Sequence, residues 1–391
     1  VDVLFTTEDE LPLASAGKQG MAAYQHLFDL GVSLVVTKQA ERGCAIVTSG
    51  RHLSAAAYPS AVSDTLGAGD CLARRLRWLA LALAAAWLPG ARTVDDAFIT
   101  FRYSRNLVEG AGFVYNPGER VLGTTTPLYA SLMAALGGLL GEDYPRYALA
   151  VNGLANAGSA ALLFLIAWRL SQHLALAVWS GLLWAITPFS VTFAIGGMET
   201  SVHSFFMLAA WYAYLLGRPV GVGVACALGV LTRPDALIWA GPLLLHQLWT
   251  HWRERPGHPW LARLPWRTWG VGLALYLPWF CFAWAYFGNP LPQTVGAKAV
   301  VYQLDDLQAF IRLIQHYATP FHEHLTFGIP GIAVGVFVFP ALAVLGIRAG
   351  TLLEPRALPM LLYPWLYLVV FAAANPLIFR WYLTPPLPAY F

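Results

Sequence analysis

The sequence predicts a mainly α-helical, polytopic membrane bundle preceded by a partial α/β segment. Only 12% of the 391 residues are charged and 58% are hydrophobic, whereas an ordinary soluble domain carries about 25% charged residues. Apolar segments of roughly bilayer-spanning length recur from Leu76 onward. Residues 1–72, in contrast, hold more than a third of the acidic residues. The net charge of +3 is too small to indicate a nucleic-acid partner.

The first 72 residues show the pattern of an α/β domain. VDVLF (1–5), SLVVT (33–37) and CAIVT (44–48) are short β-rich runs, and a helical stretch covers about residues 18–30. A strand, helix, strand and hairpin in this order are typical of α/β folds. Seventy residues can form only part of such a domain.

The rest of the chain predicts about nine to ten membrane spans. A shorter apolar segment covers 127–142. The other segments lie at 76–93, 147–169, 174–195, 199–216, 219–231, 235–250, 270–287, 328–347 and 358–374.

Charged segments predict the orientation of these spans. Arg74, Arg75 and Arg77 precede the first span, so the positive-inside rule places residues 1–75 in the cytoplasm. The basic loop 251–269 belongs on the same side. If 127–142 does not cross the membrane once by itself, the remaining polar motifs all share the outer face. These motifs are 93–110, 197–200, 232–235, 287–294 and 379–383.

The motif DTLGAGD (64–70) is typical of a phosphate-binding turn. Backbone N–H groups of Gly67, Ala68 and Gly69 can hold an anion, and Asp70 can take a proton from a sugar hydroxyl. The string resembles the DTxGAGD signature of ribokinase-like (PfkB) carbohydrate kinases. VDVLFTTEDEL (1–11) is similar to that family's Asn-x-x-Glu segment, with Thr7 in place of Asn and Glu10 retained.

The PfkB resemblance covers residues 1–72. It implies that Asp70 is the catalytic base, that Gly67 to Gly69 form the anion hole, and that ATP is the co-substrate if the segment is functional. A remnant without activity is the alternative reading. The junction at 72–75 is then either a natural fusion or an assembly artefact.

The most informative stretch is TVDDAFITFRYSRNLVEGAGFVYNPGERVLGTTTPL (93–128). Asp95 and Asp96 follow a span directly, and carboxylates at a membrane edge are costly and usually functional. If residues 95–108 are helical, Asp95 and Arg102 share one side. A carboxylate can deprotonate an acceptor hydroxyl, while Arg102 or Arg105 stabilises a departing phosphate. An ordinary solvated loop with structural acid–arginine pairs is the alternative.

Further strings follow in order: GMET (197–200), LTRPDAL (231–237), YFGNPLPQTVGAKA (286–299) and FRWYLTPPLP (379–388). Together with the 93–128 stretch they resemble the polyprenyl-phosphate-sugar-dependent membrane glycosyltransferases of the GT-C fold. The likeness is strongest to bacterial members related to mycobacterial arabinofuranosyltransferases, and it covers about residues 76–391.

The GT-C resemblance implies transfer of a hexosyl or pentosyl group from a polyprenyl-phosphate donor. The acceptor would be a cell-envelope glycan, lipid or protein at the outer face of the cytoplasmic membrane. Asp95 would be the catalytic base and Asp96 its partner or a metal ligand, which leaves open a requirement for a divalent cation (Mg or Mn).

Four more residues are candidates for substrate binding. Glu199 either binds a sugar hydroxyl or complements a helix dipole. Arg233 either binds phosphate or forms a local ion pair with Asp235. Lys298 and Arg380 either hold the lipid phosphate or snorkel to lipid headgroups. No protein metal site is expected, because the HEH string (322–324) has poor ligand spacing.

We therefore expect a partial kinase segment at 1–72 and a GT-C glycosyltransferase domain at 73–391, truncated at its C-terminus. The sequence begins at Val1 without methionine and ends at Phe391 inside an apolar stretch, which is typical of a fragment cut at both ends. A PfkB-type, ATP-dependent sugar kinase fused to a membrane protein is the alternative function. A transporter is the third, although the ionisable residues cluster at span ends rather than at mid-depth.

Overall fold

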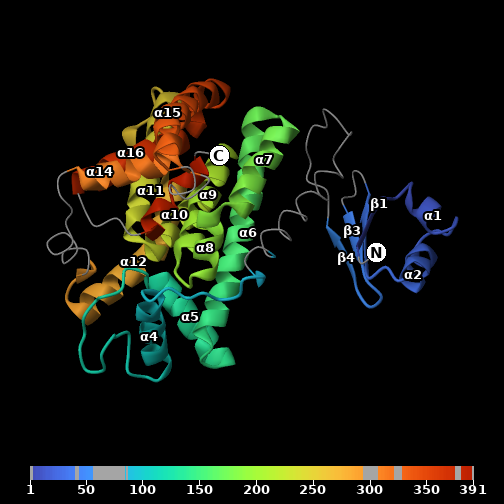
Figure 1. Ribbon diagram of the computed structural model, residues 1–391, viewed down its shortest axis with the longest axis horizontal. Helices are drawn as coiled ribbons and strands as arrows, with labels where there is room; N and C mark the ends of the chain where they lie inside the picture. The colour runs from blue at the N-terminus through green and yellow to red at the C-terminus, as the bar shows by residue number, and fades with distance from the viewer. Residues whose placement is uncertain are drawn as a thin grey trace. The chain divides into compact units, whose positions relative to one another are not determined.

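The computed structural model describes residues 3–39, 44–55, 84, 87–293, 307–320, 328–374 and 380–389. The chain divides into two compact units, Val1–Arg77 and Trp78–Phe391 (Figure 1). The segment of the predicted first span, 76–93, lies mostly outside the described residues, as do Lys298 and the whole DTLGAGD string with Gly67, Ala68, Gly69 and Asp70.

The N-terminal unit is a small α/β layer. Its four-stranded sheet has the order β1-β2-β3-β4, with β1 and β2 parallel and the other two pairings antiparallel. Two helices lie between β1 and β2 in sequence and pack apolar side chains on the sheet. The expected strands, helix and hairpin are confirmed, and β4 is an addition. The elements are β1 Val3–Thr7, α1 Leu11–Ala14, α2 Met21–Asp29, β2 Leu34–Lys38, β3 Cys44–Val47 and β4 His52–Ala55.

The second unit is helical in its described parts, as predicted. Its α-helices are α4 Ala97–Val108, α5 Pro127–Leu140, α6 Tyr144–Ser171, α7 Leu174–Ile186, α8 Pro188–Ile195, α9 Thr200–Leu215, α10 Pro219–Thr232, α11 Leu237–Glu254, α12 Trp266–Phe287, α14 Gln308–Ala318, α15 Gly328–Leu353 and α16 Leu358–Ala374. Short 3-10 turns are η2 Pro234–Ala236, η3 Trp260–Arg263, η4 Pro355–Ala357, η5 Arg380–Leu383 and η6 Leu387–Ala389.

The expected span 174–195 is not one straight helix. It is broken into α7 and α8, which are bent by 47° at Thr187 and Pro188. Proline has no N–H for the helix and its ring excludes the preceding residue from the helical region. Thr187 is accordingly extended, with ψ 136°.

Fewer helices qualify as membrane spans than the nine to ten expected. Among the described residues, four are long and apolar enough to cross a bilayer by themselves, and the bent pair α7–α8 would make a fifth. Helices α9 and α10 have only 16 and 14 residues, below the roughly 20 that a span needs. Helix α5 also has 14 residues, which rise about 21 Å against a hydrocarbon core of about 30 Å.

Large aromatic side chains fill the core of the bundle. Trp184 (α7), Trp211 (α9), Trp239 (α11) and Tyr363 (α16) are almost completely buried in one cluster, whose other members come mostly from α6, α9, α10 and α16. Burial of this apolar surface holds the polar ends of the helices in fixed positions.

Candidate active site

The acidic pair lies at the start of α4. Asp95 is exposed and Asp96 is half-buried, and the Asp95 carboxylate accepts the backbone N–H of Asp96 at 3.0 Å. The helix begins at Ala97, so the expectation of a helix from residue 95 is wrong by two residues. Both carboxylates therefore stand at the N-terminal end of α4.

The GMET string lies directly beside this pair. The N–H of Val94 donates to the carbonyl of Gly196 at 2.8 Å, and that of Arg92 donates to Ile195 at 3.0 Å. Gly197 has φ +81°, and a side chain there would contact Thr93 and Ala97 within 3.2 Å. Glycine is thus required where the two segments meet.

Two side chains from other helices fix the GMET backbone. Tyr129 of α5 donates its hydroxyl to the carbonyl of Gly197 at 3.1 Å. Asn152 of α6 donates to the carbonyl of Met198 at 2.8 Å and to the Tyr129 oxygen at 3.0 Å. Both side chains and the residues that they bond are buried, so the loop beside the acidic pair is preorganised.

A buried ion cluster joins GMET to the TRPD string. Arg233 donates through Nε and Nη2 to both carboxylate oxygens of Asp235, at 2.9 and 2.8 Å. Its Nη1 donates to Glu199 Oε1 at 3.2 Å, and the residues Arg233 and Glu199 are each 4% exposed. Burial alone raises the pKa of Asp235, but the charge and hydrogen bonds of Arg233 hold that pKa below its ordinary value.

The structure therefore brings Glu199 and Arg233 together, although they are 34 residues apart. The sequence predicted Glu199 and Arg233 as two separate substrate-binding residues. For Arg233, a local ion pair with Asp235 was the alternative. The ion pair is present. Binding of substrate by either residue stays a prediction.

The FRWYL string contacts both features. Trp381 packs against the cluster of Ala97, Phe101 and Met198, and the Tyr382 ring centroid lies 5.2 Å from Cζ of Arg233. Arg380 is the first residue of η5, and its side chain is outside what the structure describes. The string next to Arg380 is thereby placed beside the acidic turn.

Arg102 and Arg105 face other partners. Arg102 donates to the carbonyl of Tyr115 at 2.9 Å and to Asn116 Oδ1 at 3.2 Å, and its guanidinium lies over the Tyr115 ring. Arg105 pairs with Glu109 at 2.9 Å, on the exposed side of α4. Arg102 thus holds the loop after α4, and a direct role of either arginine with substrate stays a prediction.

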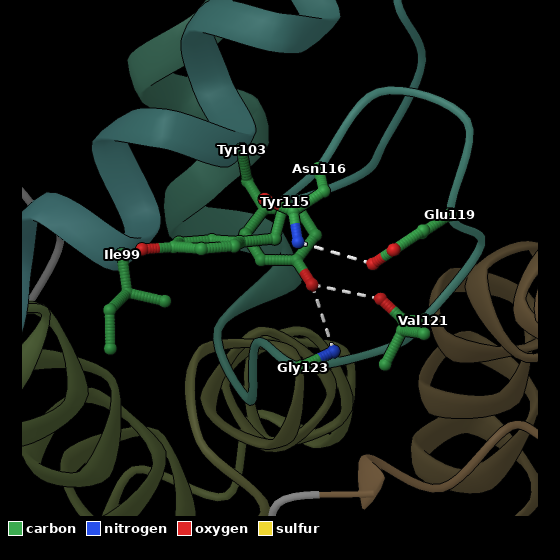
Figure 2. Close-up of a pocket in the computed structure, with 7 residues that line it drawn as sticks. All are labelled: Ile99, Tyr103, Tyr115, Asn116, Glu119, Val121 and Gly123. Atoms are coloured by element: carbon green, nitrogen blue, oxygen red, sulfur yellow. Dashed lines mark hydrogen bonds between the residues drawn. The ribbon is translucent and has the colours of Figure 1, made fainter.

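A cavity of about 300 Å³ opens between α4 and this loop (Figure 2). The Tyr103 hydroxyl donates to the carbonyl of Val121 at 2.8 Å and accepts the N–H of Gly123 at 2.9 Å. Burial raises the pKa of Tyr103, so it stays a neutral donor. Ile99 of the lining lies in the first turn of α4, directly after the acidic pair. The lining residues are Ile99, Tyr103, Tyr115, Asn116, Glu119, Val121 and Gly123.

Sequence reasoning missed Tyr115 and Glu119 as cavity residues. Their string, YNPGE, entered only as part of the 93–128 stretch. It forms a turn in which Asn116 donates to Glu119 Oε2 at 3.1 Å. The combination of an aromatic ring, an amide and a carboxylate in one short turn is the signal that could have indicated a polar ligand site.

The YFGNPLPQT string closes the same region from α12. The N–H of Gln293 donates to the carbonyl of Leu122 at 3.0 Å, and Arg120 lies over the Tyr286 ring. Figure 1 shows α4, α5 and the loop between them at one end of the bundle. All five polar strings of the membrane unit therefore have at least one member at this end, which we call the motif end. Within the described ranges, no group of three or more His, Cys, Asp or Glu is placed to hold a metal ion.

Comparisons with known proteins address the two units separately. The family model of the pfkB family carbohydrate kinases matches residues 1–73. Two structures of ArnT from Cupriavidus metallidurans, one bound to undecaprenyl phosphate and one in the apo state, align with 82% of this chain, with TM-scores of 0.54 and 0.56 at 17% and 16% identity. The oligosaccharyltransferase AglB from Archaeoglobus fulgidus, in complex with an inhibitory peptide and a dolichol-phosphate, aligns with 84%, with a TM-score of 0.51 at 14% identity.

The membrane unit has the GT-C fold. Both resemblances seen in the motifs, to GT-C transferases and to a PfkB kinase fragment, are confirmed. The chain covers 57% of the undecaprenyl-phosphate-bound ArnT structure and 50% of AglB. A comparison with curated proteins finds no match.

Proposed function

We propose that the membrane unit is a glycosyltransferase that moves a sugar from a polyprenyl phosphate to a cell-envelope acceptor. The convergence of five polar strings at one end of a GT-C fold carries this proposal. The lipid phosphates named with ArnT and AglB support a polyprenyl-phosphate donor. The sugar, a hexose or a pentose, and the acceptor, a glycan, lipid or protein, are open within this class.

In the proposed reaction Asp95 takes the proton from the acceptor hydroxyl. The acceptor oxygen forms a bond to the anomeric carbon as the bond from that carbon to the phosphate oxygen breaks, with inversion. Asp96 orients or assists Asp95. Polyprenyl phosphate leaves with the electron pair, and a cation from Lys298 or Arg380 stabilises its charge. If a divalent cation (Mg or Mn) is required, Asp96 would hold it and the cation would supply further charge stabilisation at the acidic pair.

The cavity beside α4 is the proposed site for the sugar or the acceptor. Tyr115 offers an aromatic face, and Asn116 and Glu119 offer hydrogen-bonding groups within the same lining. Arg102 stabilises this lining from outside through Tyr115. Its proposed contribution is therefore to position the loop, while Glu199 and Arg233 brace GMET against TRPD.

Charge distribution supports an outward-facing motif end. The helix ends that lie away from the motif end are joined by two ion pairs. Arg169 lies 3.8 Å from Glu354, and Arg356 lies 3.8 Å from Glu254. We call this the basic end, because it carries eight arginines and two glutamates. They are Arg169, Arg218, Arg253, Arg255, Arg263, Arg267, Arg348, Arg356, Glu254 and Glu354. By the positive-inside rule the basic end faces the cytoplasm of a multi-pass inner-membrane protein.

Substitution of Asp95 by Asn tests the proposal. Membranes that make the product are given donor with a radiolabelled sugar, and transfer is followed over time. Asp95→Asn is expected to lower the rate by about 100-fold or more, which is the usual contribution of a general base. Glu109→Gln is the matched control, because Glu109 is an exposed acid near the same end that pairs with Arg105. Unchanged transfer by Asp95→Asn would contradict its role.

The PfkB match to residues 1–73 favours a second candidate function, an ATP-dependent sugar kinase segment. Thr7 and Glu10, the Asn-x-x-Glu positions, bond each other reciprocally: the N–H of Thr7 donates to Glu10 at 3.0 Å and the N–H of Glu10 to Thr7 at 3.2 Å. Measurement of ATP binding to the full chain tests this function. A phosphoryl-transfer assay then compares the full chain with an Asp70→Asn variant. Absence of ATP binding would leave the segment as a remnant.

A further inference from the structure

The basic end contains a second cavity that the proposed transfer reaction does not use. It has a volume of about 150 Å³ and lies where α9, α10 and α11 end or begin, beside η4. Helices α9 and α11 start at the GMET and TRPD strings and run to this cavity. It is therefore at the far end of these helices from the acidic pair.

The lining of this cavity is built to hold an anion. Arg218 and Arg356 contribute two guanidinium groups. Thr250 and His251 also line the cavity, and the Thr250 hydroxyl and His251 Nδ1 are bonded to the carbonyl of Gln247, at 2.8 and 3.1 Å. One acid, Glu254, lies at the rim; its side chain is 59% exposed and is 3.8 Å from Arg356. The cations therefore outnumber the single exposed carboxylate.

A buried amide gives a second, independent indication of a ligand. Gln247 lines the cavity and is 3% exposed. Its Nε2 donates to Thr268 at 2.8 Å, whereas Oε1 is buried without a hydrogen-bond partner. A buried acceptor left without a donor costs about 1–3 kcal/mol, so a ligand hydroxyl or ammonium group at this position would stabilise the site.

We propose that this cavity binds the phosphate of an anionic ligand that also donates a hydrogen bond to Gln247. A phospholipid headgroup with a glycerol hydroxyl has this chemistry. The two arginines hold the phosphate by charge-assisted hydrogen bonds, and the hydroxyl donates to Oε1 of Gln247. The net positive charge of the whole basic end draws such headgroups to the entrance. Inorganic phosphate supplies anionic phosphate oxygens without the glycerol hydroxyl.

Binding to the purified full chain in uncharged detergent tests this site. Thermal unfolding is followed while short-chain phosphatidylglycerol, phosphatidylcholine or inorganic phosphate is titrated. We expect phosphatidylglycerol to raise the unfolding temperature and phosphatidylcholine to have little effect. Arg218→Gln and Arg356→Gln are each expected to weaken phosphatidylglycerol binding by roughly tenfold or more, since a hydrogen bond to a charged group is lost.

Two further variants keep the result interpretable. Arg348→Gln is the matched control, because Arg348 belongs to the basic end but does not line the cavity. Gln247→Glu places a carboxylate against the ligand and should abolish binding; its unfolding temperature without lipid reports whether it folds. An equal effect of inorganic phosphate that depends on the same arginines identifies free phosphate as the ligand and supports the site. Binding that is unchanged in both arginine variants, or lost equally in Arg348→Gln, overturns it.

Discussion

The buried cluster of Arg233 with Glu199 and Asp235 makes a sharp prediction about stability. Arg233 is 4% exposed and donates three hydrogen bonds to the two carboxylates. Arg233→Met keeps much of the side-chain volume but leaves both acids buried without their cation. Removal of one partner from a buried ion pair costs about 3–5 kcal/mol.

The expected effect is a lower unfolding temperature of the membrane unit. At about 2 °C per kcal/mol for a large domain, the loss corresponds to a decrease of about 6–10 °C. Thermal unfolding in detergent, followed by tryptophan fluorescence, measures this change. Trp239, which donates to His203 in the core of the bundle, is one of the 16 tryptophans that contribute to this signal.

A combined variant separates charge from packing. Adding Glu199→Gln and Asp235→Asn to Arg233→Met removes the uncompensated charges and should restore part of the lost stability. If Arg233→Met unfolds at the wild-type temperature, the ion cluster does not brace GMET against TRPD. If the triple variant is no more stable than Arg233→Met, the loss arises from packing and the electrostatic reasoning is refuted.

Three further predictions follow from the described contacts. Tyr103→Phe removes a donor to Val121 and leaves the N–H of Gly123 without its acceptor. We therefore expect the free energy of unfolding to fall by about 1–3 kcal/mol, and KM to rise with little change in kcat. An unchanged KM would show that the cavity beside α4 does not bind substrate. Gly223→Val should destabilise the bundle by about 1–3 kcal/mol, because a side chain there meets the Thr268 backbone of α12, whereas Gly241→Ala, which has open space, should be neutral or stabilising in the same thermal assay. The pKa of Asp235 is lowered in the folded protein, so the Asp235 carboxylate stabilises the fold fully above the ordinary carboxyl pKa range. This stabilisation is lost as the pH falls through the lowered pKa. The melting temperature of the wild type should therefore fall more steeply under acid than that of Asp235→Asn, and an equal or shallower fall would contradict this assignment.

The sequence by itself determined the class of each unit. Low charge and recurring apolar runs require a membrane bundle, because such a chain cannot cover its surface with polar groups. Alternating β-rich runs predicted the sheet of the N-terminal unit, because side-chain alternation is a local property of a strand. The motifs also indicated the resemblance of each unit to known proteins, since a short string of characteristic residues can be recognised in the sequence alone.

The sequence predicted helix boundaries only in part, where these depend on the detailed backbone conformation. Pro188 is visible in the sequence, but the 47° bend between α7 and α8 depends on how the freed backbone is accommodated. The start of α4 at Ala97 rather than at residue 95 follows from the pairing of Val94 with Gly196. That partner is about a hundred residues away along the chain.

Only the tertiary structure decided which polar groups meet. Periodicity placed Asp95 and Arg102 on one side of a helix, yet Arg102 holds Tyr115 and Asn116 instead. Glu199 and Arg233 were independent candidates until the packing of α9 against α10 joined them in one buried cluster. Hydrophobic periodicity specifies which face of a helix is buried, but the partner on that face is set by the complementary packing of whole helices, which no local pattern contains.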